Sequence, residues 1–305
     1  MTVSQWPPVA EPYIIERLFR HKIMSADELL VHSDASLADL LGISITSCRK
    51  LLHAVAGPHL GSPKTGFEVF AMNELKIGTS LSSLDSAFHG GLQKGWLCEL
   101  FGEAGSGKTQ MCFTITAHAL RSGREVFWID SEGSFRPERI MEIYGPGGNE
   151  VFENLHVCKC GSMSEMMEVI DGLLPTLSSR SDPGLIVVDS VAALVRGLFP
   201  NALAQRQKSL HQFAVLVRKL NATTICTNHV KANMGSPAVR SSGILPALGN
   251  TWSHDVTCRL WMRMSDENAA TDRNCRHRWV EIQKCPGSPP VNISVKITSH
   301  GVVEV

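Results

Sequence analysis

The segment Gly102-Glu-Ala-Gly-Ser-Gly107-Lys108-Thr109 indicates the architecture of this chain. It has the G-x-x-x-x-G-K-T spacing of a phosphate-binding loop, and it lies between a predicted strand, Trp96–Phe101, and a predicted helix, Lys108–Leu120. In such a loop, glycines let successive backbone N–H groups curl around a phosphate, and the helix N-terminus adds positive potential. A glycine-rich turn that binds nothing is the alternative, but both the pattern and its surroundings favour a nucleotide site.

The residue types of this loop suit ATP with Mg²⁺. Lys108 supplies a cation for the β- and γ-phosphate oxygens, and the Thr109 hydroxyl is a Mg²⁺ ligand. The residues that we expect around the nucleotide are Gly102, Glu103, Ala104, Gly105, Ser106, Gly107, Lys108, Thr109 and Gln110.

Strand and helix patterns alternate through the rest of the chain. Short apolar runs separated by helical patterns indicate a parallel sheet with helices on both faces. We therefore expect an α/β fold with a mostly parallel central sheet, extended by a C-terminal β meander. The strands are predicted at Trp96–Phe101, Glu125–Asp130, Leu155–Cys158, Leu185–Asp189 and Thr223–Thr227; the helices at Lys108–Leu120, Pro137–Tyr144, Met163–Leu177 and Leu203–Leu220; and the meander at Val256–Met264, Trp279–Lys284 and Val291–Thr298.

The first part of the chain has a different pattern. From residue 11 to about 57, apolar side chains recur at helical spacing, which predicts four or five short helices, and Gly42 suits a tight turn between two of them. Gly and Pro then cluster, as in a linker. We expect a small all-α domain at 1–60, a linker at 61–78 and the α/β core at 79–305.

Charge is balanced overall but unevenly distributed. The chain has 29 basic and 29 acidic residues among 305, which argues against a wholly basic nucleic-acid binder. From Ser190 to His254, however, there is no Asp or Glu. We call this stretch the acid-free window. Its seven basic residues are Arg196, Arg206, Lys208, Arg218, Lys219, Lys231 and Arg240.

Composition also bears on the cellular compartment. The nine cysteines include no C-x-x-C pair, which favours reduced thiols over a disulfide framework or a zinc knuckle. The first nine residues do not have the pattern of a secretory signal, and no uncharged apolar run approaches the ~20 residues of a membrane span. We expect a cytosolic or nuclear protein without a membrane partner.

Two acidic residues follow predicted strands. Asp189 ends one strand, and Glu132 comes two residues after another. Open α/β sheets bind ligands at the carboxyl ends of their strands. We expect Asp189 to anchor Mg²⁺ and Glu132 to orient and deprotonate an attacking water. Each could instead be an ordinary carboxylate, because apolar strands often end in Asp and several acids could serve as the base.

Taken together, these motifs resemble the RecA-like strand-exchange recombinases, in their eukaryotic and archaeal branch. The resemblance covers roughly residues 11–305, with the small helical domain before the ATPase core. The motifs that carry it are Gly102–Thr109, Ile129-Asp-Ser-Glu-Gly-Ser-Phe-Arg-Pro-Glu-Arg139, Leu185–Ser190 and Thr227-Asn-His229. Leu84–Gly91 and Ala247–His254 are most similar to the B-type recombinase paralogue.

The resemblance implies roles for single residues. Glu132 matches the residue that activates water and, with Lys108, forms the expected catalytic pair. Arg139 matches a residue that packs on the adenine. His254 matches a histidine that senses the γ-phosphate from a neighbouring protomer; a surface histidine is the alternative. His229 stands where the family usually has a Gln that links the γ-phosphate to a DNA-binding loop, so its coupling of ATP to DNA is an open question.

The resemblance also implies DNA contacts. Two mobile loops line the DNA channel of these recombinases, and here they correspond to about Arg196–Lys208 and Val230–Pro246. We expect DNA binding that is independent of sequence and sensitive to salt. A solvated basic face that touches nothing specific is the alternative. The implied DNA-binding residues are Arg196, Arg206, Lys208, Lys231 and Arg240.

The function that follows is an ATP-dependent, DNA-binding recombinase paralogue in the nucleus, with slow DNA-dependent ATPase activity. It would assist the main recombinase on single-stranded DNA, with other paralogues as partners and double-stranded DNA as a further candidate. The polymerisation motif Phe-x-x-Ala is altered to Phe67-Glu-Val-Phe70-Ala71, which favours a defined hetero-oligomer over long homofilaments. Two alternatives remain: a strand-exchange recombinase in its own right, and a scaffold subunit in which ATP only joins subunits.

Overall fold

The computed structural model of the chain describes residues 6, 10–24, 26–30, 32–56, 65–66, 76–146, 152–177, 184–196, 203–220, 222–232, 244–265 and 277–305. The chain divides into two compact units, residues 1–71 and 72–305. The boundaries 1–60, 61–78 and 79–305 stay a proposal, because most of the expected linker, including Phe67, Phe70 and Ala71, lies outside the described residues.

The first unit is a group of short helices around a leucine core. Leu18, Leu29, Leu37 and Leu41 are fully buried within it. Gly42 ends the third helix with φ +60°, the left-handed conformation that favours glycine, so the predicted tight turn is confirmed. The helices are α1 (Pro12–Arg20), α2 (Ala26–Leu30), α3 (Asp34–Leu41) and α4 (Ile45–Ala56).

The second unit is built on one large sheet. Its strands are β3 (Leu97–Gly102), β4 (Val126–Asp130), β5 (Leu155–Lys159), β6 (Leu185–Asp189), β7 (Thr223–Ala232), β8 (Ile244–Pro246), β9 (Cys258–Met264), β10 (His277–Lys284), β11 (Asn292–Thr298) and β12 (Gly301–Glu304). A small sheet pairs β1 (Lys76–Ile77) with β2 (Leu92–Gln93).

Nine of these strands lie in the order β12-β11-β10-β9-β3-β7-β6-β4-β5, and β8 pairs with β7. Pairing is parallel from β9 to β5 and antiparallel through β9, β10, β11 and β12. The predicted parallel sheet and C-terminal meander are therefore confirmed. The phosphate-loop strand β3 is central, because it lies between β7 and β9.

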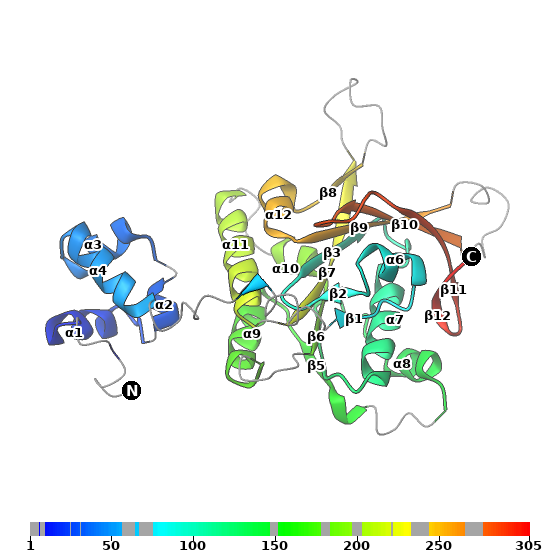
Figure 1. Cartoon of the computed structure of the whole chain (residues 1–305), viewed down its shortest axis with the longest axis horizontal. Coiled ribbons are helices and arrows are strands. Elements are labelled where there is room, and N and C mark those ends of the chain that lie inside the picture. Colours follow the sequence, from blue (N-terminus) through cyan, green and yellow to red (C-terminus); the bar gives the residue numbers. More distant parts are fainter. Residues whose placement is uncertain are drawn as a thin grey trace, which may run out of the picture. The chain divides into compact units, whose positions relative to one another are not determined.

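Helices cover both faces of this sheet (Figure 1). They are α6 (Ser82–Ala87), α7 (Lys108–Arg121), α8 (Pro137–Tyr144), α9 (Met163–Leu177), α10 (Val191–Arg196), α11 (Leu203–Lys219) and α12 (Gly249–Asp255). One apolar cluster includes α7 and α8, and the other includes α9, α10, α11 and α12. Side chains alternate between the two clusters along a strand: Leu185 and Val187 belong to the first, and Ile186 and Val188 to the second.

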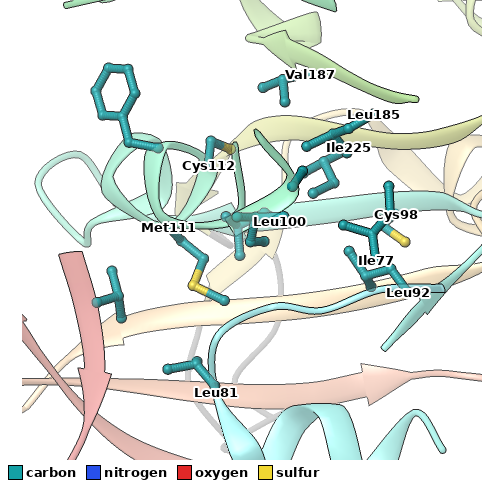
Figure 2. Close-up of a cluster of buried hydrophobic side chains, with 14 of the residues drawn as sticks. Ile77, Leu81, Leu92, Cys98, Leu100, Met111, Cys112, Leu185, Val187 and Ile225 are labelled. Atoms are coloured by element: carbon teal, nitrogen blue, oxygen red, sulfur yellow. The ribbon is translucent and has the colours of Figure 1, made fainter. Parts of the chain in front are cut away.

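Figure 2 shows part of the first cluster, in which Leu100 of β3 lies near Met111 of α7 and Cys98 of β3 lies near Ile77 and Leu92. This packing fixes the helix against the strand that precedes the phosphate loop. Among the helices of the described part of the chain, none combines the length and apolarity that crossing a bilayer requires.

Candidate nucleotide site

The predicted phosphate loop connects β3 to α7. Two of its glycines are required for different reasons. Gly107 has φ +103° at the start of α7, a conformation that side chains disfavour. A Cβ on Gly102 would lie 2.1 Å from the backbone oxygen of Met262, so β9 leaves no room for a side chain there.

Lys108 is the buried cation of this loop. Its Nζ donates to the backbone oxygens of Gly102, at 3.0 Å, and Glu103, at 2.8 Å. Burial lowers the pKa of Lys108 from its usual value, although the nearby carboxylates of Asp189 and Glu132 oppose this effect. A phosphate group beside Nζ would favour the charged amine, so the loop suits an anionic ligand.

Two further features of the loop fit a triphosphate. The hydroxyl of Ser106 is buried, and it has no hydrogen-bond partner among the described residues. The N-terminus of α7, a 14-residue helix, lies at the loop, where its N–H groups favour an anion.

Asp189 and Thr109 meet where a magnesium ion is expected. Thr109 Oγ1 donates to Asp189 Oδ2 at 2.8 Å, and Ser134 Oγ donates to the same oxygen at 2.9 Å. Thr227 Oγ1 donates to Asp189 Oδ1. The described residues include no group of three or more His, Cys, Asp and Glu side chains that could hold a metal. One hydroxyl and one carboxylate fit Mg²⁺, which usually completes its shell with water and substrate phosphates.

Glu132 is held from two neighbouring strands. Its Oε1 accepts a hydrogen bond from Ser190 Oγ at 2.7 Å, and His229 Nε2 lies 2.8 Å from the same oxygen. The side chain of Glu132 is 32% exposed, so water can reach it. A partly exposed carboxylate oriented by two polar groups is suited to take a proton from water.

Sequence reasoning missed Asp130 and Ser190. Asp130 Oδ1 accepts from the backbone nitrogens of Gly133 at 2.9 Å and Ser134 at 3.1 Å, which shapes the turn that presents Glu132. Ser190 orients Glu132 directly. The available signal was that each polar residue lies at the carboxyl end of a predicted strand.

The Rad51 family model matches residues 71–305 of this chain. The chain belongs to the Rad51 family. It is 28% identical to human "DNA repair protein RAD51 homolog 2" over 95% of this chain and 86% of that protein. It is also 28% identical to "DNA repair and recombination protein RadA" of Methanocorpusculum labreanum, over 85% of this chain and 88% of that protein. A rice relative, "Meiotic recombination protein DMC1 homolog B", is 28% identical over 95% of this chain and 87% of that protein.

These findings confirm the resemblance to RecA-like recombinases and to the B-type paralogue, RAD51 homolog 2. They do not assign roles to single residues of this Rad51-family chain. The expected roles of the phosphate loop, Glu132, Asp189, Arg139, His229 and His254 therefore remain proposals that rest on the geometry.

Arg139 and Gln110 lie together beside the phosphate loop. Arg139 Nε donates to Gln110 Oε1 at 2.8 Å, and the guanidinium also donates to the backbone oxygens of Thr298 and Ser299. The meander thus fixes Arg139 close to the start of α7. This placement is compatible with a guanidinium that lines an adenine pocket.

His254 lies on the short helix α12, where its side chain is exposed. The amine of Lys284 holds the end of this helix by donating to the backbone oxygens of Ser253 at 2.9 Å and Val256 at 2.6 Å. Within the described residues, His254 is thus on a fixed and accessible part of this Rad51-family core. This position suits the proposed contact with a neighbouring protomer.

Helices and strands occupy the ends of the two ranges that we expected to be DNA loops. Helix α10 continues to Arg196, and α11 begins at Leu203, so Arg206 and Lys208 lie on a helix. At the second loop, β7 extends to Ala232 and pairs antiparallel with β8, because hairpin pairing satisfies backbone groups that a loop would leave to water. Loops were therefore wrongly expected at residues 230–232 and 244–246, which are strands. Residues 203–208 belong instead to the helix that the sequence predicted at Leu203–Leu220.

The described residues place only part of the basic set. Lys208 is exposed on α11, and Arg206 is half-buried. Arg240 and the side chains of Arg196 and Lys231 lie outside the described residues. One basic residue of the acid-free window has a structural role instead. Arg218 donates to the backbone oxygen of Asp255, immediately after the window.

Proposed function

We propose that this chain is a recombinase paralogue that binds ATP, Mg²⁺ and single-stranded DNA. Its role is to assist the assembly or stability of the main recombinase filament during homologous recombination and double-strand break repair. We place this activity in the nucleus, with other recombinase paralogues and the main recombinase as partners and double-stranded DNA as a further candidate.

The observation that carries the proposal is the convergence of Lys108, Thr109 and Asp189 at one end of the sheet, with Glu132 close by. When bound, ATP with Mg²⁺ supplies the phosphoryl group that is transferred to water. Lys108 provides the cation beside the phosphates, and Thr109 and Asp189 provide the metal ligands. Glu132 takes the proton of the water, while Ser190 and His229 hold its carboxylate.

Two alternatives have some support. The same ATPase residues would serve a strand-exchange recombinase that acts alone. A scaffold subunit would need the nucleotide but no DNA. Electron microscopy with ATP and single-stranded DNA, with and without the organism's main recombinase, separates the three. A paralogue lengthens or stabilises the partner's filaments, whereas a recombinase forms regular filaments alone. A scaffold associates with protein partners whether or not DNA is present.

Lys231 and Arg240 provide the first test of DNA contact. For single-stranded DNA, the logarithm of the binding constant falls linearly with the logarithm of the salt concentration, and each phosphate contact contributes about −0.7 to the slope. Changing both residues to Ala should therefore make this slope less steep by roughly 1.4. All DNA sequences should be affected alike, and ATP affinity should stay near that of the parent. Fluorescence anisotropy of labelled oligonucleotides between about 50 and 200 mM salt measures this slope.

The matched control changes Lys50 and Lys296 to Ala, which removes the same charge from exposed positions outside the acid-free window. This pair should leave the slope unchanged. An unchanged slope for Lys231→Ala with Arg240→Ala would assign these residues to solvent or to a protein partner, and it would favour the scaffold.

A further inference from the structure

A carboxylate lies buried in the strand that leads to the phosphate loop. Glu99 of β3 is 0% exposed and lies three residues before Gly102. Its neighbours Cys98 and Leu100 belong to the apolar cluster around α7 (Figure 2). Because side chains alternate along a strand, Glu99 faces the opposite side of the sheet, toward α12.

Three donors from three other elements meet at this carboxylate. Asn228 Nδ2 of β7 donates to Oε1 at 2.6 Å, and Trp252 Nε1 of α12 donates to the same oxygen at 2.8 Å. Arg259 Nε of β9 donates to Oε2 at 2.6 Å. Glu99 therefore joins the two neighbouring strands and one helix to β3.

Core packing alone does not account for a carboxylate here. Removing a charge from water is costly even when it is paired, and an apolar side chain would fill the space at a lower cost. A carboxylate differs from an apolar side chain because it fixes the direction of every donor around it. What these donors hold in place is therefore informative.

Two of the donors are neighbours of nucleotide-site residues. Asn228 directly precedes His229, which contacts Glu132. Trp252 lies two residues before His254, on the same helix. Glu99 itself continues into the phosphate loop through β3. One buried group thus contacts each of the segments that carry the loop and the two histidines.

We propose that Glu99 is a positioning residue that holds β7 and α12 in register with the phosphate loop, so that His229 and His254 are correctly oriented for the nucleotide. This inference rests on the proposed function, and it assigns the site a supporting residue that acts through others. Glu99 is fully buried, so it acts on the nucleotide only through its neighbours.

Three substitutions test the contacts of Glu99 separately. Glu99→Gln keeps the volume and one acceptor oxygen but sets an amide against Arg259. Asn228→Ala removes the hydrogen bond between Glu99 and β7. Trp252→Phe removes the indole N–H together with part of the buried ring system. An aromatic ring still remains to pack on Phe213, whose ring centroid is 6.0 Å from that of Trp252. The matched control is Ile225→Val, which removes a buried methyl group from β7 on the opposite face.

The first measurement needs no nucleotide. In protein labelled only at histidine, the ring signal of His229 is identified by its loss in His229→Gln. Glu99→Gln and Asn228→Ala should both shift this signal, whereas Ile225→Val should not. Trp252→Phe should shift the signal of His254 and leave that of His229 in place.

The second measurement is steady-state ATP hydrolysis. Glu99→Gln and Asn228→Ala should lower kcat by about 10-fold, as loss of an outer-shell partner commonly does, while KM for ATP stays near the parent value. Ile225→Val should change neither, although it lowers the melting temperature.

The inference is overturned if the His229 signal stays unchanged in both Glu99→Gln and Asn228→Ala. It is also overturned if the fall in kcat of these variants is no larger than their loss of melting temperature accounts for. Should Glu99→Gln not fold, Asn228→Ala and Trp252→Phe still test two of its hydrogen bonds, one in each variant. A parent protein that does not hydrolyse ATP contradicts the proposed ATPase activity. The histidine spectra still decide the role of Glu99 in that case.

Discussion

Replacing Glu132 with Gln lowers ATP hydrolysis by at least ~10²-fold and leaves ATP binding intact, if the carboxylate is the general base. The amide oxygen can still accept from Ser190, which now donates to Oε1 at 2.7 Å. The geometry is therefore kept, and only the proton acceptor is lost. Phosphate release measured beside a fluorescent-ATP titration separates the two effects.

Glu138→Gln is the control for this substitution, because Glu138 is an exposed carboxylate of α8. It should hydrolyse ATP at the parent rate. Parent-level activity in Glu132→Gln would move the catalytic role to another acid, and the contacts of Glu132 with Ser190 and His229 would then have only a structural meaning.

Replacing Lys108 with Ala should abolish most nucleotide binding. Truncating one partner of a buried charge pair costs about 2 to 5 kcal/mol, so the Kd for ATP should rise about 30-fold or more. Lys108→Arg should retain more binding but lose turnover, because the wider guanidinium displaces the γ-phosphate from its position. Calorimetric titration of ATP into each variant measures the change in Kd.

The melting temperature separates a binding defect from misfolding. Among the described residues, no carboxylate lies at hydrogen-bond distance from the desolvated amine of Lys108. Lys108→Ala should therefore melt no earlier than the parent when nucleotide is absent. Added ATP should raise the melting temperature of the parent and of Lys296→Ala, but not that of Lys108→Ala. A Lys108→Ala protein that hydrolyses ATP like the parent would contradict the site assignment.

The parts of the fold that follow from neighbouring residues could be predicted from the sequence. The run at Leu185–Asp189 forms the expected strand, and α8 has the expected bounds, Pro137–Tyr144. The strand expected at Leu155–Cys158 extends one residue further, to Lys159. Spacing alone also predicted that the loop at 102–109 leads into a helix. These features depend on local periodicity and on glycine, whose effects act over a few residues.

The surroundings of the site residues depended on tertiary structure. The sequence suggested Glu132 as a base, but not that Ser190 and His229, 58 and 97 residues away along the chain, would hold it. Nothing local predicts that Arg139 would bind the backbone oxygens of Thr298 and Ser299. Such contacts arise only when distant strands meet at the same end of the sheet.

Gly102 shows the same division at a single position. Its place in the spacing G-x-x-x-x-G-K-T was enough to predict a phosphate loop. The reason that glycine is needed there is the backbone oxygen of Met262, 160 residues further along, which would lie 2.1 Å from a Cβ. Local pattern determined which loop forms, because turn geometry and helix initiation act within a few residues. Only the close packing of β9 against β3 determined what surrounds it, because that distance is set by the whole sheet.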